Sequence, residues 1–318
     1  MPNLLAHYLL ANQFYVREGE ISSKIKNKSF IENNKDLFFL GAYGPDPLFY
    51  SGVNPFKGLH LINACKKYGN KIHKSDGRLY FKSLIDVLHS IESETEANQF
   101  KSFIFGQFAH YLLDREAHPY ILYKSGFSKD GKIKGIYHYK HAYYESKIDS
   151  VLATSYNFDR FFSKPEEIIP HMHSYLKFLD KYYYYSLRNY FNDKRIYKHY
   201  YSNGVINYYS WIKYSNHGSP LRVKIFGKTS LAATRVPHQV REDVLNENKN
   251  VWLYPTTGDK SNKSFHEILV YCSSILEKLY VELLKKGFTY ETFSKYIDGR
   301  NYYGNFINAK WIYKEEKR

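Results

Sequence analysis

The sequence is poor in cysteine: its 318 residues include only Cys65 and Cys272, which lie far apart. This pair supplies neither a disulfide framework nor a cysteine-based zinc site. No apolar run approaches the roughly 18 residues that span a bilayer. The first residues lack the basic segment, apolar stretch and small-residue cleavage site of a secretory signal. These absences predict a cytoplasmic protein without a transmembrane segment. Because no disulfide is expected, a reducing compartment would not destabilise it.

Acidic residues are also scarce relative to basic ones. The 46 Lys and Arg residues exceed the 31 Asp and Glu residues by 15, which is the formal net charge. Such an excess attracts polyanions, either anionic lipid head groups or nucleic acid. The lysines are spread along the chain without blocks, so a general lysine-rich bias of an A/T-rich genome explains them equally well.

Aromatic residues are abundant, with 34 Tyr and 22 Phe. The run Tyr182–Tyr185 offers three interpretations: an interfacial belt at a membrane, a stacking surface for bases, or helix packing with the hydroxyl groups at the surface. Successive tyrosines on a helix point in all directions, so we expect some of them to be exposed.

Apolar residues recur at about 3.6-residue intervals, which predicts helices. Ser264 with Glu267 forms a capping box, and Gly287 is a suitable C-cap. Strand signals are scarce, and the Gly-, Pro- and Ser-containing stretch 203–263 resembles a long loop with one short helical piece. We predict an all-α chain that forms one domain, 1–318, with a helical core in 1–200 and a long loop plus C-terminal helices in 201–318. The helices are expected near residues 3–17, 57–70, 77–92, 95–117, 137–153, 166–192 and 264–287.

Potential metal ligands recur at regular spacings. Residues four apart share one face of a helix, so the repeated four-residue steps aim imidazoles and carboxylates at one volume. These are ligand types that suit zinc. A lone pair of this kind is more often an ordinary helix salt bridge, but the complete set favours a multi-metal hydrolase site. Its members are Asp46, His60, His110, Asp114, His118, His141 and Glu145.

The residues around Asp114 support this interpretation. Residues 103–113 are apolar almost all round, which predicts a buried helix. A buried carboxylate must be paired or coordinated, because an isolated one loses several kcal/mol on leaving water. Metal coordination would satisfy Asp114 together with His110 and His118.

The same residues lie in segments that resemble the bacterial zinc-dependent phospholipase C family. The resemblance covers about the first half of the chain and implies an all-helical fold, like that of the phospholipases C and the single-strand zinc nucleases, with a multi-zinc cleft. Weaker similarities follow at Leu245, Asn246 and 252–255. The segments that carry the resemblance are 1–12, 41–47, His60, 110–114 and 141–145.

The resemblance also implies ligands for two or three Zn²⁺ ions. The first ion would be held by Asp46, His60, His110 and Asp114, with Asp114 bridging to a second. His7 would bind the second ion, and the third would be held by His118, His141 and Glu145.

Two features depart from the family pattern. Secreted members complete one site with an N-terminal tryptophan, whereas this chain begins Met1-Pro2, which leaves the second metal short of one ligand. Either the processed N-terminus reaches this metal, another side chain substitutes, or the site is weak or empty. His118 also follows Asp114 more closely than in the best-known members. Pro119 restricts His118, so we expect the helix to end there. His138 is an alternative to His141, which alone has the four-residue relation to Glu145.

Neighbouring charged residues have less specific interpretations. Arg115 and Glu116 are expected to form a surface salt bridge. Asp149 either orients His141 or is a helix-surface acid.

The resemblance and ligand set imply a zinc-dependent phosphodiester hydrolase. The expected activity is that of a phospholipase C, with a metal-bound hydroxide as nucleophile and Asp46 and Asp114 as the catalytic carboxylates. Its partner would be phospholipid at a membrane surface, where anionic lipid would hold the protein peripherally. A nuclease or nucleotidase acting on nucleic acid is the alternative, and a non-catalytic relative is a third. The sequence specifies neither a head group nor an oligomeric state.

Overall fold

The computed structural model describes the chain except for residues 1–3, 27, 53–61, 159–161, 163–172, 218, 220, 225, 238 and 316–318, and gives only the backbone of 62–66, 173 and 222. The described part is mostly helical, as predicted, with one two-stranded antiparallel ladder. Its elements are α1 (Leu4–Ile25), η1 (Glu32–Asn34), α2 (Lys35–Gly41), η2 (Asp46–Tyr50), α3 (Ile62–Lys74), α4 (Gly77–Leu88), α5 (Glu94–Ser125), α6 (Ile136–Ser155), α7 (His173–Phe191), α8 (Tyr200–Asn216), α9 (Leu221–Lys224), η4 (Ala232–Thr234), β1 (Trp252–Leu253), β2 (Lys260–Ser261), α10 (Phe265–Lys286) and α11 (Tyr290–Ser294).

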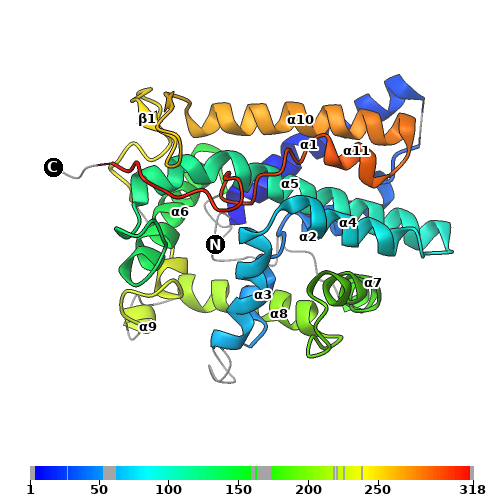
Figure 1. Ribbon diagram of the computed structural model, residues 1–318, viewed down its shortest axis with the longest axis horizontal. Coiled ribbons are helices and arrows are strands. Elements are labelled where there is room, and N and C mark those ends of the chain that lie inside the picture. Colours follow the sequence, from blue (N-terminus) through cyan, green and yellow to red (C-terminus); the bar gives the residue numbers. More distant parts are fainter. Residues whose placement is uncertain are drawn as a thin grey trace.

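The helices are arranged around α5, which runs through the middle of the molecule with α10 along one side and α7 and α8 on the other (Figure 1). Helices α1, α2, α4, α6 and α10 all contact α5. The apolar stretch 103–113 is buried, as its composition predicted. One continuous hydrophobic cluster extends from α1 to Tyr302, so the core joins the two ends of the described chain.

Helix α2 crosses α5 at unusually short range. A Cβ atom added to Gly41 would overlap the carbonyl oxygen of Phe103, and one added to Gly106 would overlap that of Phe38. The two backbones therefore touch where both residues are glycine. The chain leaves α2 at this crossing and reaches Asp46 at the start of η2.

Helix α5 does not end at Pro119, which corrects the prediction from the sequence. It continues to Ser125 with Pro119 in its interior. The residues that follow, Tyr120, Ile121 and Leu122, are buried, and their packing outweighs the backbone hydrogen bond that proline cannot make. Gly304 lies against this interruption, because an added Cβ would meet the Arg115 carbonyl oxygen and the Pro119 ring.

Helix α8 is the second correction. The stretch 203–263 was expected to be a loop with one short helical piece, yet α8 has 17 residues and covers its first part. Tyr201, Val205, Tyr208 and Ile212 are buried at three- and four-residue steps, which is a helical face. Intervening Ser, Asn and Gly residues obscured this periodicity.

Other predictions from the sequence are confirmed. The Ser264–Glu267 capping box begins α10, and Gly287 is its C-cap. In the tyrosine run on α7, Tyr183 is buried against Phe103 and Tyr201, whereas Tyr185 is exposed. Helix packing therefore accounts for Tyr183. Among the described helices, none combines the length and apolar character required to cross a bilayer.

The glycine contact between α2 and α5 gives a stability prediction. We expect Gly106→Ala to lower the free energy of unfolding by about 1–3 kcal/mol, because the new methyl group forces the helices apart. Gly19→Ala is a matched control, since an added Cβ at Gly19 has no atom within 4 Å. That change should stabilise α1 by about 0.5–1 kcal/mol. Urea unfolding measures both, and a Gly106→Ala protein as stable as wild type would contradict the close contact.

Candidate metal centre

Three groups of buried side chains offer closely spaced donor atoms. Within each group the donor atoms lie within 4.8 Å of one another. Two groups share His110, so they form one continuous cluster. The groups are His7, His110 and Asp114; Asp46, His73 and His110; and His118, His141 and Glu145.

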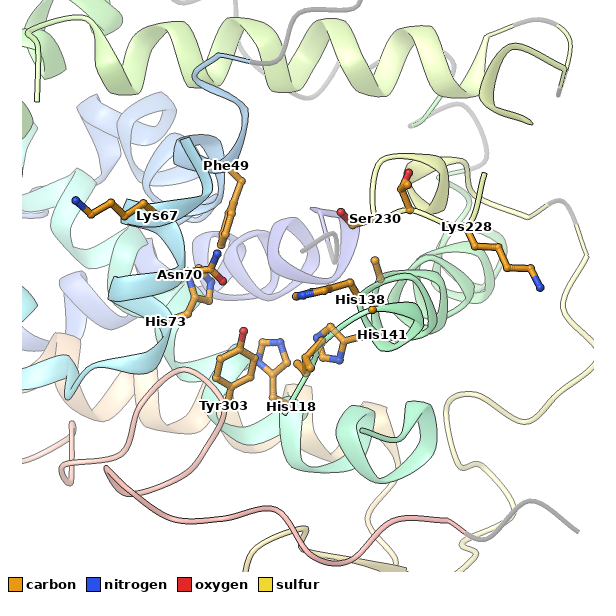
Figure 2. A pocket seen from close by; sticks show the side chains of 14 residues that line it. Phe49, Lys67, Asn70, His73, His118, His138, His141, Lys228, Ser230 and Tyr303 are labelled. Atoms are coloured by element: carbon orange, nitrogen blue, oxygen red, sulfur yellow. The ribbon is translucent and has the colours of Figure 1, made fainter. Parts of the chain in front are cut away.

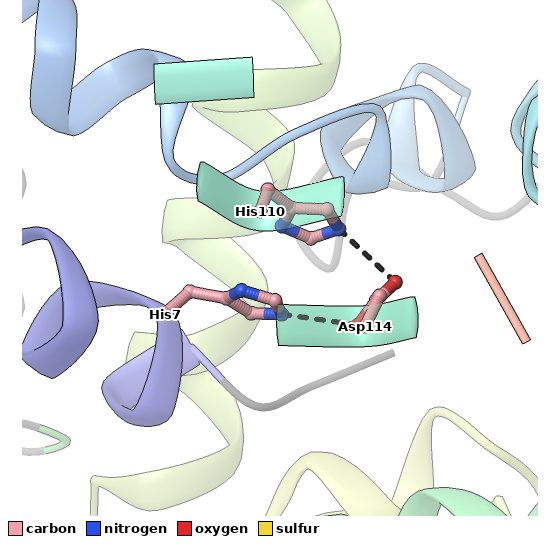
Figure 3. Close-up of side chains that lie close together, drawn as sticks. All are labelled: His7, His110 and Asp114. Atoms are coloured by element: carbon pink, nitrogen blue, oxygen red, sulfur yellow. Dashed lines mark ion pairs between the residues drawn. The ribbon is translucent and has the colours of Figure 1, made fainter. Parts of the chain in front are cut away.

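The first group joins α1 to α5 (Figure 3). His7 projects from α1, and His110 and Asp114 lie one turn apart on α5, as their spacing predicted. Nε2 of His7 is 3.3 Å from Oδ1 of Asp114, and Nε2 of His110 is 3.3 Å from Oδ2. The His7 and His110 rings are stacked with centroids 3.8 Å apart. Asp114 thus presents its two oxygens to different histidines.

The second group adds η2 and α3 to the cluster. Nε2 of His73 lies 3.2 Å from Oδ1 of Asp46 and 3.5 Å from Oδ2 of Asp114. Nε2 of His110 is 3.9 Å from Oδ1 of Asp46. Gly44 has a positive φ of 59°, and an added Cβ there would overlap the His110 ring. The turn before Asp46 therefore packs directly against the His110 ring.

The third group lies between α5 and α6. Nε2 of His118 is 3.3 Å from Oε1 of Glu145, and Nε2 of His141 is 3.2 Å from the same oxygen. The two imidazole rings are nearly parallel, with centroids 5.3 Å apart. Pro119 does not prevent His118 from facing inward, although the helix continues through it.

Backbone carbonyls orient three of these imidazoles. Nδ1 of His110 donates to Ala42 at 3.1 Å, Nδ1 of His73 to Gly69 at 2.8 Å, and Nδ1 of His118 to Tyr302 at 2.8 Å. A carbonyl oxygen only accepts, so each Nδ1 carries a proton and each Nε2 faces the cluster. This second contact is typical of metal-binding histidines.

The local charges also suit a cation. Burial would raise the pKa of Asp46 and Asp114, but the surrounding histidines hold it below the ordinary value, and the pKa of Glu145 is likewise lowered. Burial and His110 lower the pKa of His7 to about 4. Burial disfavours protonation of His73, yet Asp114 and Asp46 raise its pKa to about 9. A proton on His73 thus provides positive charge between two carboxylates, a position that suits a metal ion.

The buried imidazoles and carboxylates fit a zinc ion. Within the described residues, the ion pairs of Asp46 and Asp114 are with histidines. Several buried polar atoms have no hydrogen-bond partner among the described residues, and such a group costs about 1–3 kcal/mol. These atoms include Nδ1 of His7, Oδ1 of Asp46, Nε2 of His110 and Nδ1 of His141. A coordinated cation would remove that cost for Oδ1 of Asp46 and Nε2 of His110, which face the cluster.

A cleft of about 560 Å³ opens over the cluster. His73, His118 and His141 lie in its lining, and His138 and Tyr303 line it as well (Figure 2). A small molecule entering the cleft therefore reaches the second and third groups directly.

A family model described as zinc-dependent phospholipase C matches residues 3–196. The chain belongs to the zinc-dependent phospholipase C family. No curated protein and no solved structure gives a significant match. Membership implies a hydrolase and zinc as the metal, in agreement with the imidazole and carboxylate donors. The matched range contains all three groups, but Tyr302, which orients His118, lies beyond it.

The sequence predicted most of the clustered residues: the ligand spacing indicated six of them, and the resemblance to the zinc-dependent phospholipase C family added His7. His7, Asp46, His110, Asp114, His118, His141 and Glu145 all lie in the three groups. His60 lies outside the described residues. His138 lines the cleft but belongs to none of the groups among the described residues, whereas His141 does.

Sequence reasoning missed His73. The residue lies near the end of α3 in a lysine-rich stretch, which resembles a solvated surface. One signal was present: buried Tyr68 and Ile72 define an apolar face, and His73 borders it. A histidine at the edge of such a face is a candidate for burial.

Two charged residues depart in part from the expectations, although the predicted ion pair between Arg115 and Glu116 is present. Arg115 is buried, not at the surface, and donates to the Tyr296 carbonyl and to Glu116. Asp149 is also buried and does not orient His141. Its carboxyl oxygens accept from the backbone N–H groups of Leu5 and Ala6, each at 3.2 Å. Asp149 therefore binds the first turn of α1, directly beside His7.

The Asp149 contact predicts a loss of stability on truncation. We expect Asp149→Ala to lower the free energy of unfolding by about 2–4 kcal/mol, because two buried N–H groups lose their acceptor. Asp86→Ala is the matched control: this exposed residue pairs with Lys82 one turn away, and its loss should barely change the urea midpoint. Equal midpoints for the two variants would show that Asp149 does not hold α1.

Proposed function

We propose that this protein is a phospholipase C that hydrolyses glycerophospholipids to diacylglycerol and a phosphorylated head group. The observation that carries the proposal is the buried cluster of oriented imidazoles and carboxylates at the base of an open cleft. Family membership supports a phospholipase C-type hydrolase, and the cluster offers imidazole and carboxylate donors of the kind that zinc takes.

The ligand assignment follows the three groups. Asp46, His73 and His110 would hold one ion, with Asp114 bridging to a second held by His7. His118, His141 and Glu145 would hold a third. The contacts of the two Asp114 oxygens support a shared role, because Oδ1 lies near His7 and His118 whereas Oδ2 lies near His110 and His73.

Zinc in these positions supplies Lewis acidity, which polarises a phosphoryl oxygen and makes water a nucleophile near neutral pH. The protein contributes proton transfer and orientation. Asp46 is the proposed base, because its histidine neighbours keep its pKa low and its carboxylate ionised. Its Oδ atoms accept the proton of the attacking water. Asp114 holds the surrounding imidazoles at fixed angles through its contacts with His7, His73 and His110.

The substrate would be a phospholipid in a membrane surface. The net charge of +15 favours approach to anionic lipid, which would hold the protein peripherally. A zinc-dependent nuclease or nucleotidase is the alternative within the same chemistry, and release of nucleotides would identify it. A non-catalytic relative would retain the cluster without turnover.

Product analysis tests the proposal. The zinc-loaded protein is incubated with vesicles of phosphatidylcholine, phosphatidylethanolamine and phosphatidylglycerol. We expect diacylglycerol and a phosphorylated head group from wild type, and at least about a 100-fold lower rate from His110→Ala, which removes a donor shared by two groups. His266→Ala is the control, because this half-exposed histidine on α10 pairs with Glu247. Zinc-loaded protein that releases nothing would overturn lipid as substrate.

Zinc content tests the assignment of His73. We expect His73→Ala to bind fewer zinc ions per chain than wild type, because Asp46 and His110 lose the third member of their group. His266→Ala should keep the wild-type content. Dialysed proteins are compared by atomic emission. His60→Ala, measured in parallel, tests the sequence-based assignment of His60 as a ligand of the first ion. An unchanged zinc content in His73→Ala would contradict the assignment of His73.

A further inference from the structure

Hydrolysis by the proposed function leaves one proton unassigned. When the bond between phosphorus and the glyceryl oxygen breaks, its electron pair stays on that oxygen. An alkoxide is a poor leaving group, so a proton donor near that oxygen accelerates the step. Asp46 is the proposed acceptor of the water proton and is therefore not available as that donor.

The cleft lining offers few groups that suit this task. Imidazole is the side chain whose ordinary pKa lies closest to neutrality. Burial raises the pKa of Tyr303 far above that range, so its phenol retains its proton. Lys67 and Lys228 line the cleft, but their side chains extend away from the histidines (Figure 2). The amide of Asn70 and the hydroxyl of Ser230 are not acidic enough.

Four histidines line the cleft, and three of them belong to the buried groups described above. His73, His118 and His141 are 4%, 3% and 6% exposed. His138 differs because it is exposed and lies outside all three groups. It is on α6, three residues before His141, so both lie on the same face of the helix.

The position of His138 matches the geometry of the reaction. Figure 2 shows its ring extending from α6 into the cleft, opposite His73 and Asn70. In an in-line displacement, the attacking water and the leaving oxygen lie on opposite sides of phosphorus. Asp46, the proposed base, contacts His73 on one wall. An acid on the facing wall would lie beside the leaving oxygen.

We propose that His138 is the general acid that protonates the diacylglycerol leaving oxygen, a role that rests on the proposed phospholipase C activity. Water forms the new bond to phosphorus while the bond from phosphorus to the glyceryl oxygen breaks. A ring N–H of the His138 imidazolium transfers its proton to that oxygen, which becomes the hydroxyl of diacylglycerol. The water proton passes to Asp46, and solvent restores both side chains.

The test compares two leaving groups in His138→Gln. The substrates are the phospholipid that wild type hydrolyses fastest and the p-nitrophenyl ester of the same phosphorylated head group. The p-nitrophenolate ion departs without a proton, so only the lipid needs the acid. We expect kcat for the phospholipid to fall by about 100-fold or more, and kcat for the aryl ester to change by less than about threefold. Zinc content should remain at the wild-type value.

The other results would each overturn the role. An equal fall in kcat on both substrates, with full zinc content, would indicate that His138 binds substrate. A lower zinc content would indicate that His138 is a zinc ligand. Unchanged kcat of His138→Gln on both substrates would show that His138 takes no part in the reaction. His266→Gln, the same change outside the cleft, is the matched control. Failure of the proposed function itself is distinguishable, because wild type would then release no diacylglycerol.

Discussion

The contact between the backbones of α2 and α5 determines the geometry of the whole centre. Gly41 and Gly106 leave no room for a side chain, so the two helices meet at one fixed place. Asp46 follows this crossing after a short turn, and Gly44 within the turn lies against the His110 ring. A displacement of either helix would therefore separate Asp46 from the histidines that neutralise it. The packing of two glycines thus controls the electrostatics of buried carboxylates several residues away.

Those carboxylates make the cluster costly to bury, and its arrangement offsets that cost. Asp114 contacts four imidazoles from α1, α3 and α5, which distribute its charge among several elements. A cation bound at this point would link helices that are distant in sequence. Asp149 makes a comparable link without a metal, because it joins α6 to the beginning of α1. The centre is therefore also a structural junction.

Local periodicity was sufficient to predict the helical class and the pairs His110–Asp114 and His141–Glu145, because four-residue spacing on one helix fixes proximity. His73 was not predictable in this way, since its partners lie on η2 and α5. The predicted end of α5 at Pro119 was wrong because tertiary packing outweighs the local preference of proline. Helix α8 was predicted as loop because small polar residues interrupt its apolar face. The roles of Asp149 and Arg115 depend on backbone groups of remote segments. A single domain over 1–318 stays a prediction, which the continuous core from α1 to Tyr302 favours.

The carbonyl of Tyr302 accepts from Nδ1 of His118, a residue 184 positions earlier in the chain. During translation, His118, His141 and Glu145 emerge from the ribosome long before this acceptor. Until Tyr302 follows, the Asp114 carbonyl, one turn earlier on α5 and 3.0 Å away, is the local acceptor for that nitrogen, and the second acceptor is still missing. The order of synthesis therefore delays completion of the centre until residue 302 has been added.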